Sequence, residues 1–361
     1  MQRRQFLGAA GAGAALVSLG TSAHAETPAV KWRLTSSFPK SLDILYGASE
    51  SLAKRVALLT EGRFEIRVFA GGEIVPAFGV LDAVSQNTVE CAHTASYYFH
   101  GKNKALALDC TMPFGLNSRQ INAWVQFGGG LAMLRKLFAT YRIVNFPGGN
   151  TGAQMGGWFR KEIKSLEDIR GLKIRIPGFG GEIFAALGAV PQSLPGAEVY
   201  PALEHGALDA AEWTVPHDDE KLGFYKVARY YYYPGWWDVG SQVSFYVNQG
   251  AWEGLPKSYQ VAFEMAAQEV ASEMQAAYDA KNPPALQRLL QAGVELRRFP
   301  DDLLRAAYEV ALRLYAEESA KNPMFKRIVD SQLAFQTSSD AWWAISEAPM
   351  ANLMQGLRRK R

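Results

Sequence analysis

The chain has 361 residues, 48% hydrophobic and 20% charged, which is typical of a globular protein with one large or two ordinary domains. Its net charge is only +3, and no run of basic residues interleaved with aromatic ones occurs outside the last few residues. We therefore expect no nucleic-acid partner. Its two cysteines, Cys91 and Cys110, are too few for a disulfide scaffold or a cysteine metal motif, and the sequence leaves their pairing open.

Residues 1–25 have the features of an export signal. Arg3 and Arg4 precede an apolar stretch, and residues 23–25 fit a cleavage site of the A-x-A type. The arginine pair also resembles a twin-arginine signal, and a general secretory signal would contain the same residues. We therefore predict an exported protein and leave the export route open.

The mature chain then alternates strands and helices. We expect a strand at 30–38, a helix at 41–62, a second strand at 63–74, and a short helix leading into a buried strand that starts at Val89. Such alternation favours a largely parallel sheet with helices on both faces.

The same order recurs later in the chain. The segment 199–214 resembles 80–94 at an offset of 119 residues, and 171–188 resembles 63–74. The repeat predicts two similar α/β lobes whose strand ends face a shared cleft, although such resemblances also arise by chance in α/β chains.

The rest of the chain is mostly helical. The expected elements are a β-rich run at 240–252, helices at 257–282 and 285–293, a brief strand at 294–300, a helix at 301–322, and a helical segment to Leu353. Apolar stripes on the C-terminal helices could brace two lobes or mediate a dimer.

The mature chain lacks the common metal, nucleophile and nucleotide motifs, and none of its histidines is spaced as a metal ligand. We therefore expect no enzyme. For a secreted enzyme, Asp218, Asp219 and Glu220 would be the nearest candidates for paired catalytic carboxylates. Their place after Pro216 is more typical of a solvated turn.

Polar residues interrupt apolar segments in several places. Arg175 precedes a break at residues 177–178, where it could offer a bidentate fork to a carboxylate or extend from a sheet edge. Asn150 and Gln154 lie among small residues that would let a ligand approach the backbone, as an ordinary loop also would. Glu212, beside Trp213, ends an apolar run, where a buried carboxylate needs a positive partner.

At these residues the sequence resembles the solute-binding subunits of tripartite ATP-independent periplasmic (TRAP) transporters, over essentially the whole mature chain. The most specific segments are "SLEDIRGLKIRIPG" (165–178) and "ALEHGALDAAEW" (202–213). Within the family, "ASYYF", "NTGAQMGGWF", "DAAEW" and "YYPGWW" resemble the branch that binds 2-oxo acids such as pyruvate. Close relatives in that branch take 2-hydroxy acids such as lactate.

The resemblance implies a two-lobed α/β periplasmic-binding-protein fold, each lobe a mixed sheet flanked by helices, with long C-terminal helices. We assign 26–148 with 240–285 to lobe I, 149–239 with 286–340 to lobe II, and 341–361 to a helical tail. The resemblance also implies a periplasmic location and a homodimer built by the C-terminal helices. Its expected partners are the membrane subunits of the transporter.

The resemblance further implies a site in the cleft. Arg175 matches the arginine that pairs with the substrate carboxylate. The other expected substrate-binding residues are Thr94, Ser96, Tyr97, Asn150, Gln154 and Trp213. The expected ligands of an accompanying metal cation are Gln154, Glu212, Trp213 through its main-chain oxygen and, as the loosest match, Gln242.

A cation is physically sensible there because Glu212 alone would repel a carboxylate substrate in a low-dielectric cleft. Oxygen ligands favour a hard cation, and one carboxylate among neutral oxygens leans toward a monovalent ion, so we expect sodium rather than calcium. The sequence thus predicts capture of a small 2-oxo monocarboxylate, such as pyruvate or 2-oxobutyrate, for sodium-coupled uptake. A 2-hydroxy acid binder is the first alternative and a secreted enzyme the second.

Overall fold

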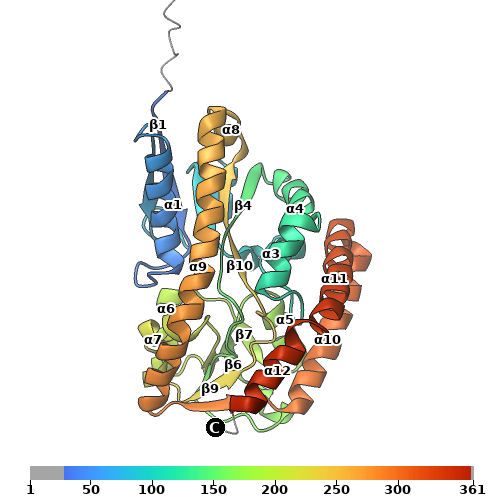
Figure 1. Cartoon of the computed structure of the whole chain (residues 1–361). Coiled ribbons are helices and arrows are strands. Elements are labelled where there is room, and N and C mark those ends of the chain that lie inside the picture. Colours follow the sequence, from blue (N-terminus) through green and yellow to red (C-terminus); the bar gives the residue numbers. More distant parts are fainter. Residues whose placement is uncertain (1–27, 359–361) are drawn as a thin grey trace, which may run out of the picture.

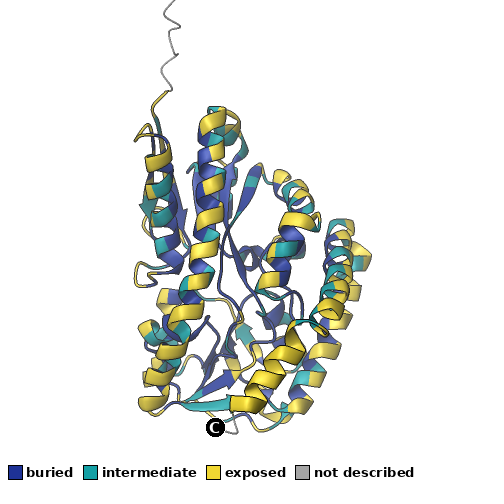
Figure 2. Ribbon diagram, in the orientation of Figure 1, coloured by how far each residue is buried: buried dark blue, intermediate teal, exposed yellow. Residues whose placement is uncertain are grey.

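Two mixed β-sheets form the cores of the two halves of the molecule (Figure 1). The computed structural model describes residues 28–358, so the predicted export signal lies outside the described residues. The strands are largely buried, whereas the outer faces of the helices are exposed (Figure 2). The predicted α/β fold with two mixed sheets and long C-terminal helices is confirmed.

The first sheet has the strand order β2-β1-β3-β10-β4. Its strands are β1 (Val30–Ser36), β2 (Phe64–Phe69), β3 (Cys91–Thr94), β4 (Ile143–Asn150) and β10 (Gln242–Asn248). Strand β1 pairs in parallel with β2 and β3, and β10 runs antiparallel to β3 and β4. The helices of this half are α1 (Leu45–Leu59), α2 (Val80–Ser85), α3 (Ser118–Phe127), α4 (Gly130–Ala139) and α8 (Gln249–Glu253), with the 3₁₀ turns η1 (Ser96–Phe99) and η2 (Lys104–Asp109).

The second sheet has the order β11-β9-β5-β8-β6-β7. Its strands are β5 (Trp158–Phe159), β6 (Lys173–Arg175), β7 (Val190–Gln192), β8 (Ala210–Ala211), β9 (Tyr230–Tyr233) and β11 (Glu295–Arg298). Strand β6 pairs in parallel with β7 and β8, and β5 runs antiparallel to β8 and β9. The helices of this half are α5 (Gly178–Ala186), α6 (Gly196–Glu204) and α7 (Pro216–Leu222), with the 3₁₀ turns η3 (Leu166–Ile169) and η4 (Phe224–Lys226).

The two sheets repeat one pattern of strand pairing, in which β3 and β8 hold equivalent places. An acidic residue precedes each strand. Glu90 accepts a hydrogen bond from the backbone N–H of Arg33 (2.7 Å), and Asp209 accepts one from that of Lys173 (3.0 Å). The predicted likeness of 80–94 and 199–214 is therefore confirmed. The predicted likeness of 171–188 and 63–74 is wrong, because β6 occupies the place of β1 and not that of β2.

Helix α9 (Lys257–Gln291) runs the length of the molecule and joins the two halves (Figure 1). It packs against α1 and β4 of the first half and against α7 of the second. We expected a break near residues 283–284, but the helix continues through Pro283 and Pro284. Tertiary packing along its length outweighs the local preference of proline to end a helix.

The C-terminal helices are α10 (Asp301–Lys321), α11 (Pro323–Trp343) and α12 (Glu347–Arg358). Helix α10 packs on α5, whereas α11 packs on α3, α4 and η2. Gln332 of α11 donates to the main-chain oxygen of Leu108 (2.9 Å), and Trp124 donates to Ser331 Oγ (3.0 Å). The division into lobes I and II stays a proposal. It assigns most of α11 to lobe II (286–340), yet α11 packs on elements of lobe I.

Both cysteines, Cys91 and Cys110, are free thiols buried in the first half. Their pairing, which the sequence left open, does not occur in this structure. Among the described residues, none of the helices combines the length and the apolar character that crossing a membrane requires.

Candidate functional site

The site begins where β6 and β8 end side by side. Arg175 is the last residue of β6 and is in register with Ala211 of β8, which places Glu212 directly beyond the strand. The backbone N–H of Glu212 donates to the Arg175 carbonyl oxygen (2.9 Å). Parallel strands that end together thus bring the predicted arginine and the predicted carboxylate to one edge of the second sheet.

Arg175 and Glu212 form a fully buried ion pair. Arg175 Nη1 lies 2.7 Å from Glu212 Oε2 and 2.8 Å from the Glu212 carbonyl oxygen. Arg175 Nε donates to the Leu194 carbonyl oxygen (3.1 Å). The sequence assigned Arg175 to the substrate and Glu212 to a cation, and the structure shows that the two side chains also contact each other. Such a pair is stabilising only while both partners are present.

One end of the Arg175 guanidinium remains available. Among the described residues, Nη2 is buried and finds no acceptor in good hydrogen-bond geometry, although the Tyr98 hydroxyl lies close enough to interact with the guanidinium. The guanidinium carbon lies 4.7 Å from the centre of the Trp213 ring, so the indole covers one face of the cation. A buried guanidinium N–H without an acceptor is costly, and a ligand carboxylate would satisfy it.

Four oxygen-bearing groups converge next to this pair. One end of the Gln154 side-chain amide lies 3.1 Å from Asp238 Oδ2, 3.1 Å from the Trp213 carbonyl oxygen and 3.3 Å from Glu212 Oε1. All four residues are at least 95% buried. We refer to Gln154, Glu212, Asp238 and the carbonyl of Trp213 as the oxygen cluster.

The amide of Gln154 can satisfy the oxygen cluster in two ways. With its NH₂ group toward the cluster it donates to three oxygens, while its oxygen accepts from Thr151 Oγ1 (3.1 Å) and Ser241 Oγ (3.2 Å). With its oxygen toward the cluster it faces acceptors alone, and its NH₂ group donates to Thr151 Oγ1 (3.1 Å). In this second orientation the Gln154 oxygen faces three other oxygens, and a cation among them would relieve their repulsion. The donor set fits a hard metal ion.

The structure does not bring every predicted site residue to the oxygen cluster. Gln242 lies elsewhere, because its amide donates to the carbonyl oxygen of Asp109 (3.0 Å). Asn150 donates to the Gly240 carbonyl oxygen (3.1 Å), and Thr94 Oγ1 lies 2.7 Å from Ser37 Oγ. Asn150 therefore holds a neighbouring backbone segment in place, and Thr94 holds the side chain of Ser37.

The remaining predicted residues lie around the cluster. Tyr97 lines two small cavities, each with a volume of about 10 Å³. One of them is also lined by Gln154 and Trp213, and the other by Asp238. Ser96 Oγ is buried and finds no partner among the described residues.

Comparison with known proteins identifies the family. Residues 35–322 match the bacterial extracellular solute-binding proteins of family 7, known as DctP. The chain belongs to this family. The predicted recognition as a TRAP solute-binding protein is confirmed, and membership of an extracytoplasmic family gives the protein a periplasmic location.

Three proteins are similar to this family-7 protein in sequence or in structure. A monocarboxylate 2-oxoacid-binding periplasmic protein of Nostoc sp. is 47% identical over 98% of each chain. A Bordetella bronchiseptica TRAP solute-binding protein, a mixed-occupancy dimer with calcium and picolinate in its active site, is 49% identical. It has a TM-score of 0.90 and covers 92% of this chain and 100% of its own. One from Pseudoalteromonas atlantica with sodium and pyruvate is 38% identical. It has a TM-score of 0.86 and covers 90% and 98%.

Burial shifts the pKa values of the two carboxyl groups in the site of this solute-binding protein. Burial raises the pKa of the Glu212 carboxyl well above its usual range; Arg175 opposes this shift, and Asp238 adds to it. Burial likewise raises the pKa of Asp238 to about 7, against the opposing pull of Ser241, Arg175 and Thr111. Burial thus favours the protonated carboxyl groups, whereas a bound cation would favour the ionised ones and offset the second negative charge beside the one guanidinium.

Asp238 is the site residue that the sequence analysis missed. It lies in the turn between β9 and β10, where its backbone N–H donates to the Gly235 carbonyl oxygen (3.0 Å) and its own carbonyl oxygen accepts from the Gln154 N–H (3.0 Å). In the sequence, Asp238 is a single acidic residue after Trp236 and Trp237 in an aromatic run. It lies outside the segments of the internal repeat, so the repeat did not indicate it.

The acidic group at 218–220 is not a solvated turn, contrary to expectation. These residues lie in α7, where Asp218 and Asp219 are fully buried. Asp219 accepts from Trp158 (2.9 Å) and Tyr231 (2.7 Å). Glu220 pairs with Arg288 (2.6 Å). Buried acids that follow a proline at the start of a helix accept structural hydrogen bonds here.

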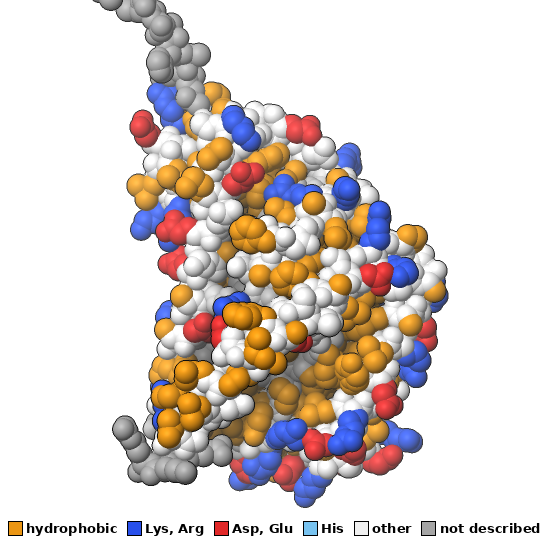
Figure 3. Space-filling view, turned by 45° about the vertical axis from the view of Figure 1, so that its right-hand side comes forward, with side chains coloured by type: hydrophobic (Ala, Val, Ile, Leu, Met, Phe, Trp, Pro, Cys, Tyr) orange, Lys and Arg blue, Asp and Glu red, His pale blue; other side chains and the backbone are white. Residues whose placement is uncertain are grey.

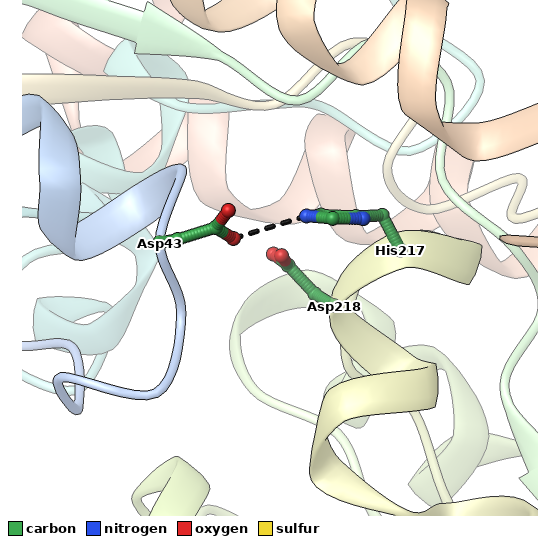
Figure 4. Close-up of side chains that lie close together, drawn as sticks. All are labelled: Asp43, His217 and Asp218. Carbon is green, nitrogen blue, oxygen red and sulfur yellow. Dashed lines mark hydrogen bonds and ion pairs between the residues drawn. The ribbon is translucent and has the colours of Figure 1, made fainter.

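A second polar cluster joins the two halves of the binding protein. Figure 4 shows Asp43, from the loop before α1, beside His217 and Asp218 of α7. Asp43 Oδ1 lies 3.0 Å from His217 Nε2 and also accepts from Lys221, while Oδ2 lies 3.4 Å from Lys281 Nζ. Because two ammonium groups already face Asp43, we interpret this cluster as a network of ion pairs and not as a metal site.

Proposed function

We propose that this protein captures a small 2-oxo monocarboxylate of the pyruvate type, together with a metal cation, as the periplasmic solute-binding subunit of a TRAP transporter. The observation that carries the proposal is the buried Arg175 beside the oxygen cluster, since its Nη2 has no well-placed acceptor among residues 28–358. A guanidinium and a cation site next to each other suit a ligand that carries a carboxylate and a neighbouring oxygen.

Each part of the site has a separate task in this proposal. Arg175 would bind the ligand carboxylate through Nη2, while Glu212 holds the guanidinium in place through Nη1. The oxygen cluster would hold the cation, which supplies a positive charge for the carboxylate and the 2-oxo oxygen.

The walls favour short, apolar tails. The cavity between Tyr97 and Trp213 is also lined by Phe38, Leu45 and Val243. The same lining includes the hydroxyl residues Tyr98, Thr151, Thr214 and Ser241 but no lysine, arginine or histidine, so the second charge of a dicarboxylate would be buried without a positive partner. The names of the relatives agree, since one is a 2-oxoacid-binding protein and another holds pyruvate with sodium.

Calorimetry on protein stripped of ligand and cations tests the proposal. We expect pyruvate and 2-oxobutyrate to bind in the presence of sodium or calcium, and a 2-oxo dicarboxylate to bind at least about 100-fold more weakly. Tighter binding of lactate than of pyruvate would shift the assignment to 2-hydroxy acids. Chemical change of the bound acid would point to an enzyme. Absence of binding of any such acid with any cation would refute the proposal.

We also propose that two copies associate through the C-terminal helices. Helix α12 has no buried residues, and its apolar side chains, among them Leu353 and Leu357, are exposed. Figure 3 shows hydrophobic side chains gathered along this part of the surface. An exposed apolar helix face of this kind is typical of an interface. Removal of residues 345–361 should convert a dimer into a monomer in analytical ultracentrifugation, and a wild-type monomer would contradict the proposal.

A further inference from the structure

We propose that Asp238 sets the cation preference of the oxygen cluster and makes it a calcium site rather than a sodium site. The inference rests on the proposed function, because it concerns the cation that accompanies the acid. It replaces the expectation of sodium, which assumed Glu212 as the one carboxylate. The structure adds a second carboxylate in contact with the same Gln154 amide (3.1 Å).

The balance of charge is the first argument. With a cation bound, Glu212 and Asp238 are both ionised, and each brings one negative charge to a site that is at least 97% buried at both residues. Arg175 brings one positive charge through its ion pair with Glu212. A bound monocarboxylate adds a further negative charge, so a neutral site requires two more positive charges. A calcium ion supplies both, whereas a sodium ion leaves one buried charge unbalanced, which is costly at low dielectric.

The number of oxygen donors is the second argument. The cluster offers one oxygen each from Gln154, Glu212, Asp238 and the Trp213 carbonyl. A 2-oxo acid that chelates through two oxygens brings the total to six, within the six to eight oxygens that calcium takes in proteins. Without Asp238 the protein would offer three oxygens, and the total would fall below that range.

The position of Asp238 is fixed by the backbone, which makes it a site residue and not a mobile surface acid. Its carbonyl oxygen accepts from the Gln154 N–H (3.0 Å), and the Gly235 N–H donates to the Gln154 carbonyl oxygen (3.2 Å). The turn that carries Asp238 and the segment that carries Gln154 are therefore held to each other. Its carboxyl also interacts with the hydroxyls of Ser241 and Thr111.

The test compares calcium and sodium on the full-length mature protein after treatment with a chelator. Terbium serves as a luminescent probe for calcium, excited through the indole of Trp213, and calorimetry gives the affinity of each cation with and without pyruvate. We expect the wild type to bind calcium far more tightly than sodium. Asp238→Asn should lose about 100-fold or more in calcium affinity, as expected for removal of a buried charged partner, while its sodium affinity changes by a few-fold at most.

Two further variants keep the result interpretable. Asp330→Asn removes an exposed carboxylate on α11 that pairs with Lys326, and it should leave both affinities unchanged. Asp238→Glu retains the charge and should keep the preference for calcium even if it weakens binding. Equal calcium affinity in the wild type and Asp238→Asn would overturn the inference. So would a wild type that prefers sodium, a comparison that stands even where Asp238→Asn fails to fold.

The two proposals fail differently. If the wild type binds no 2-oxo acid but binds calcium and loses it in Asp238→Asn, the proposed ligand is wrong and the role of Asp238 stands. If pyruvate binds equally well with sodium and with calcium in the wild type and in Asp238→Asn, the proposed function stands and the role of Asp238 is wrong.

Discussion

Asp43 Oδ1 and His217 Nε2 lie 3.0 Å apart and connect the loop before α1 to helix α7, across the two proposed lobes. A second connection of the same kind joins Glu182 of α5 to His100 (2.9 Å) and to Lys104 (2.8 Å). Each connection unites a carboxylate from one lobe with a histidine and a lysine from the other. Such contacts stabilise the arrangement in which the lobes touch, and a ligand bound between the lobes dissociates only when they separate.

We therefore predict that Asp43→Asn weakens binding of pyruvate through faster dissociation. The effect should be about three- to fivefold, because exposed ion pairs contribute at most about 1 kcal/mol. Stopped-flow tryptophan fluorescence measures the dissociation rate. Asp82→Asn is the matched control, since its ion pair with Lys102 (3.0 Å) lies within one lobe. Equal effects of the two substitutions would show that the inter-lobe contact has no special role.

Substitution of Arg175 should affect binding and stability together. Arg175→Ala removes the acceptor-free Nη2 and leaves Glu212 buried without its partner, at a cost of about 3–5 kcal/mol in the free energy of unfolding. Arg175→Lys should retain little binding, because a lysine lacks the fork that serves Glu212 and the ligand at once. Calorimetry and urea unfolding measure the two effects.

A double substitution separates the two roles of Arg175. Adding Glu212→Gln to Arg175→Ala removes the unpaired carboxyl, so it should recover part of the stability and none of the binding. Unchanged pyruvate affinity in Arg175→Ala would exclude Arg175 from the site.

A glycine beside the cluster should be sensitive to a single methyl group. In Gly235→Ala the added Cβ would lie 2.6 Å from the carbonyl oxygens of both Gln154 and Met155, which are backbone atoms. The segment that positions the Gln154 side chain must then move, and cation affinity should fall about 10- to 100-fold, as for residues that support metal ligands. Gly47→Ala is the control, because nothing lies within 4 Å of its Cβ. Equal cation affinity in both variants would show that Gly235 does not support the cluster.

The repeat of strand pairing explains what the sequence could predict. Arg175, Glu212 and Trp213 lie at the ends of two adjacent parallel strands, and such ends meet at one sheet edge. Asp238 could not be found in this way, because a turn after β9 brings it to Gln154. Gln242 was placed at the site by likeness to the family, but its side chain is directed to Asp109.

The continuity of α9 shows a second limit of local patterns. Two consecutive prolines predict a helix end, and the contacts of the helix with both halves outweigh that preference. Burial of His93 shows the same limit. Its ring is fully buried and stacks on Phe245 with ring centres 4.5 Å apart, which the local sequence does not indicate.

The buried ring of His93 should make stability depend on pH. Burial lowers the pKa of His93 from 6.5 to about 3, against the opposing effect of two backbone carbonyl groups. Between these pH values the unfolded chain binds a proton that the folded chain does not, so the free energy of unfolding decreases as the pH falls. The decrease is about 1.4 kcal/mol per pH unit, or about 2 kcal/mol between pH 6.5 and pH 5.

Buried acids change the free energy of unfolding in the opposite direction as the pH falls, so the contribution of His93 has to be isolated by comparing variants. The raised pKa values of Asp109 (about 6) and Asp218 (about 7) favour the folded state as the pH falls. We therefore compare urea unfolding at pH 6.5 and pH 5 in the wild type, His93→Leu, and the control His205→Asn at an exposed histidine. His93→Leu should lose about 2 kcal/mol less than the wild type over this interval, and the control should match the wild type. The same loss in His93→Leu and the wild type would mean that His93 is protonated in the folded protein, which its packing against Phe245 and Phe38 opposes.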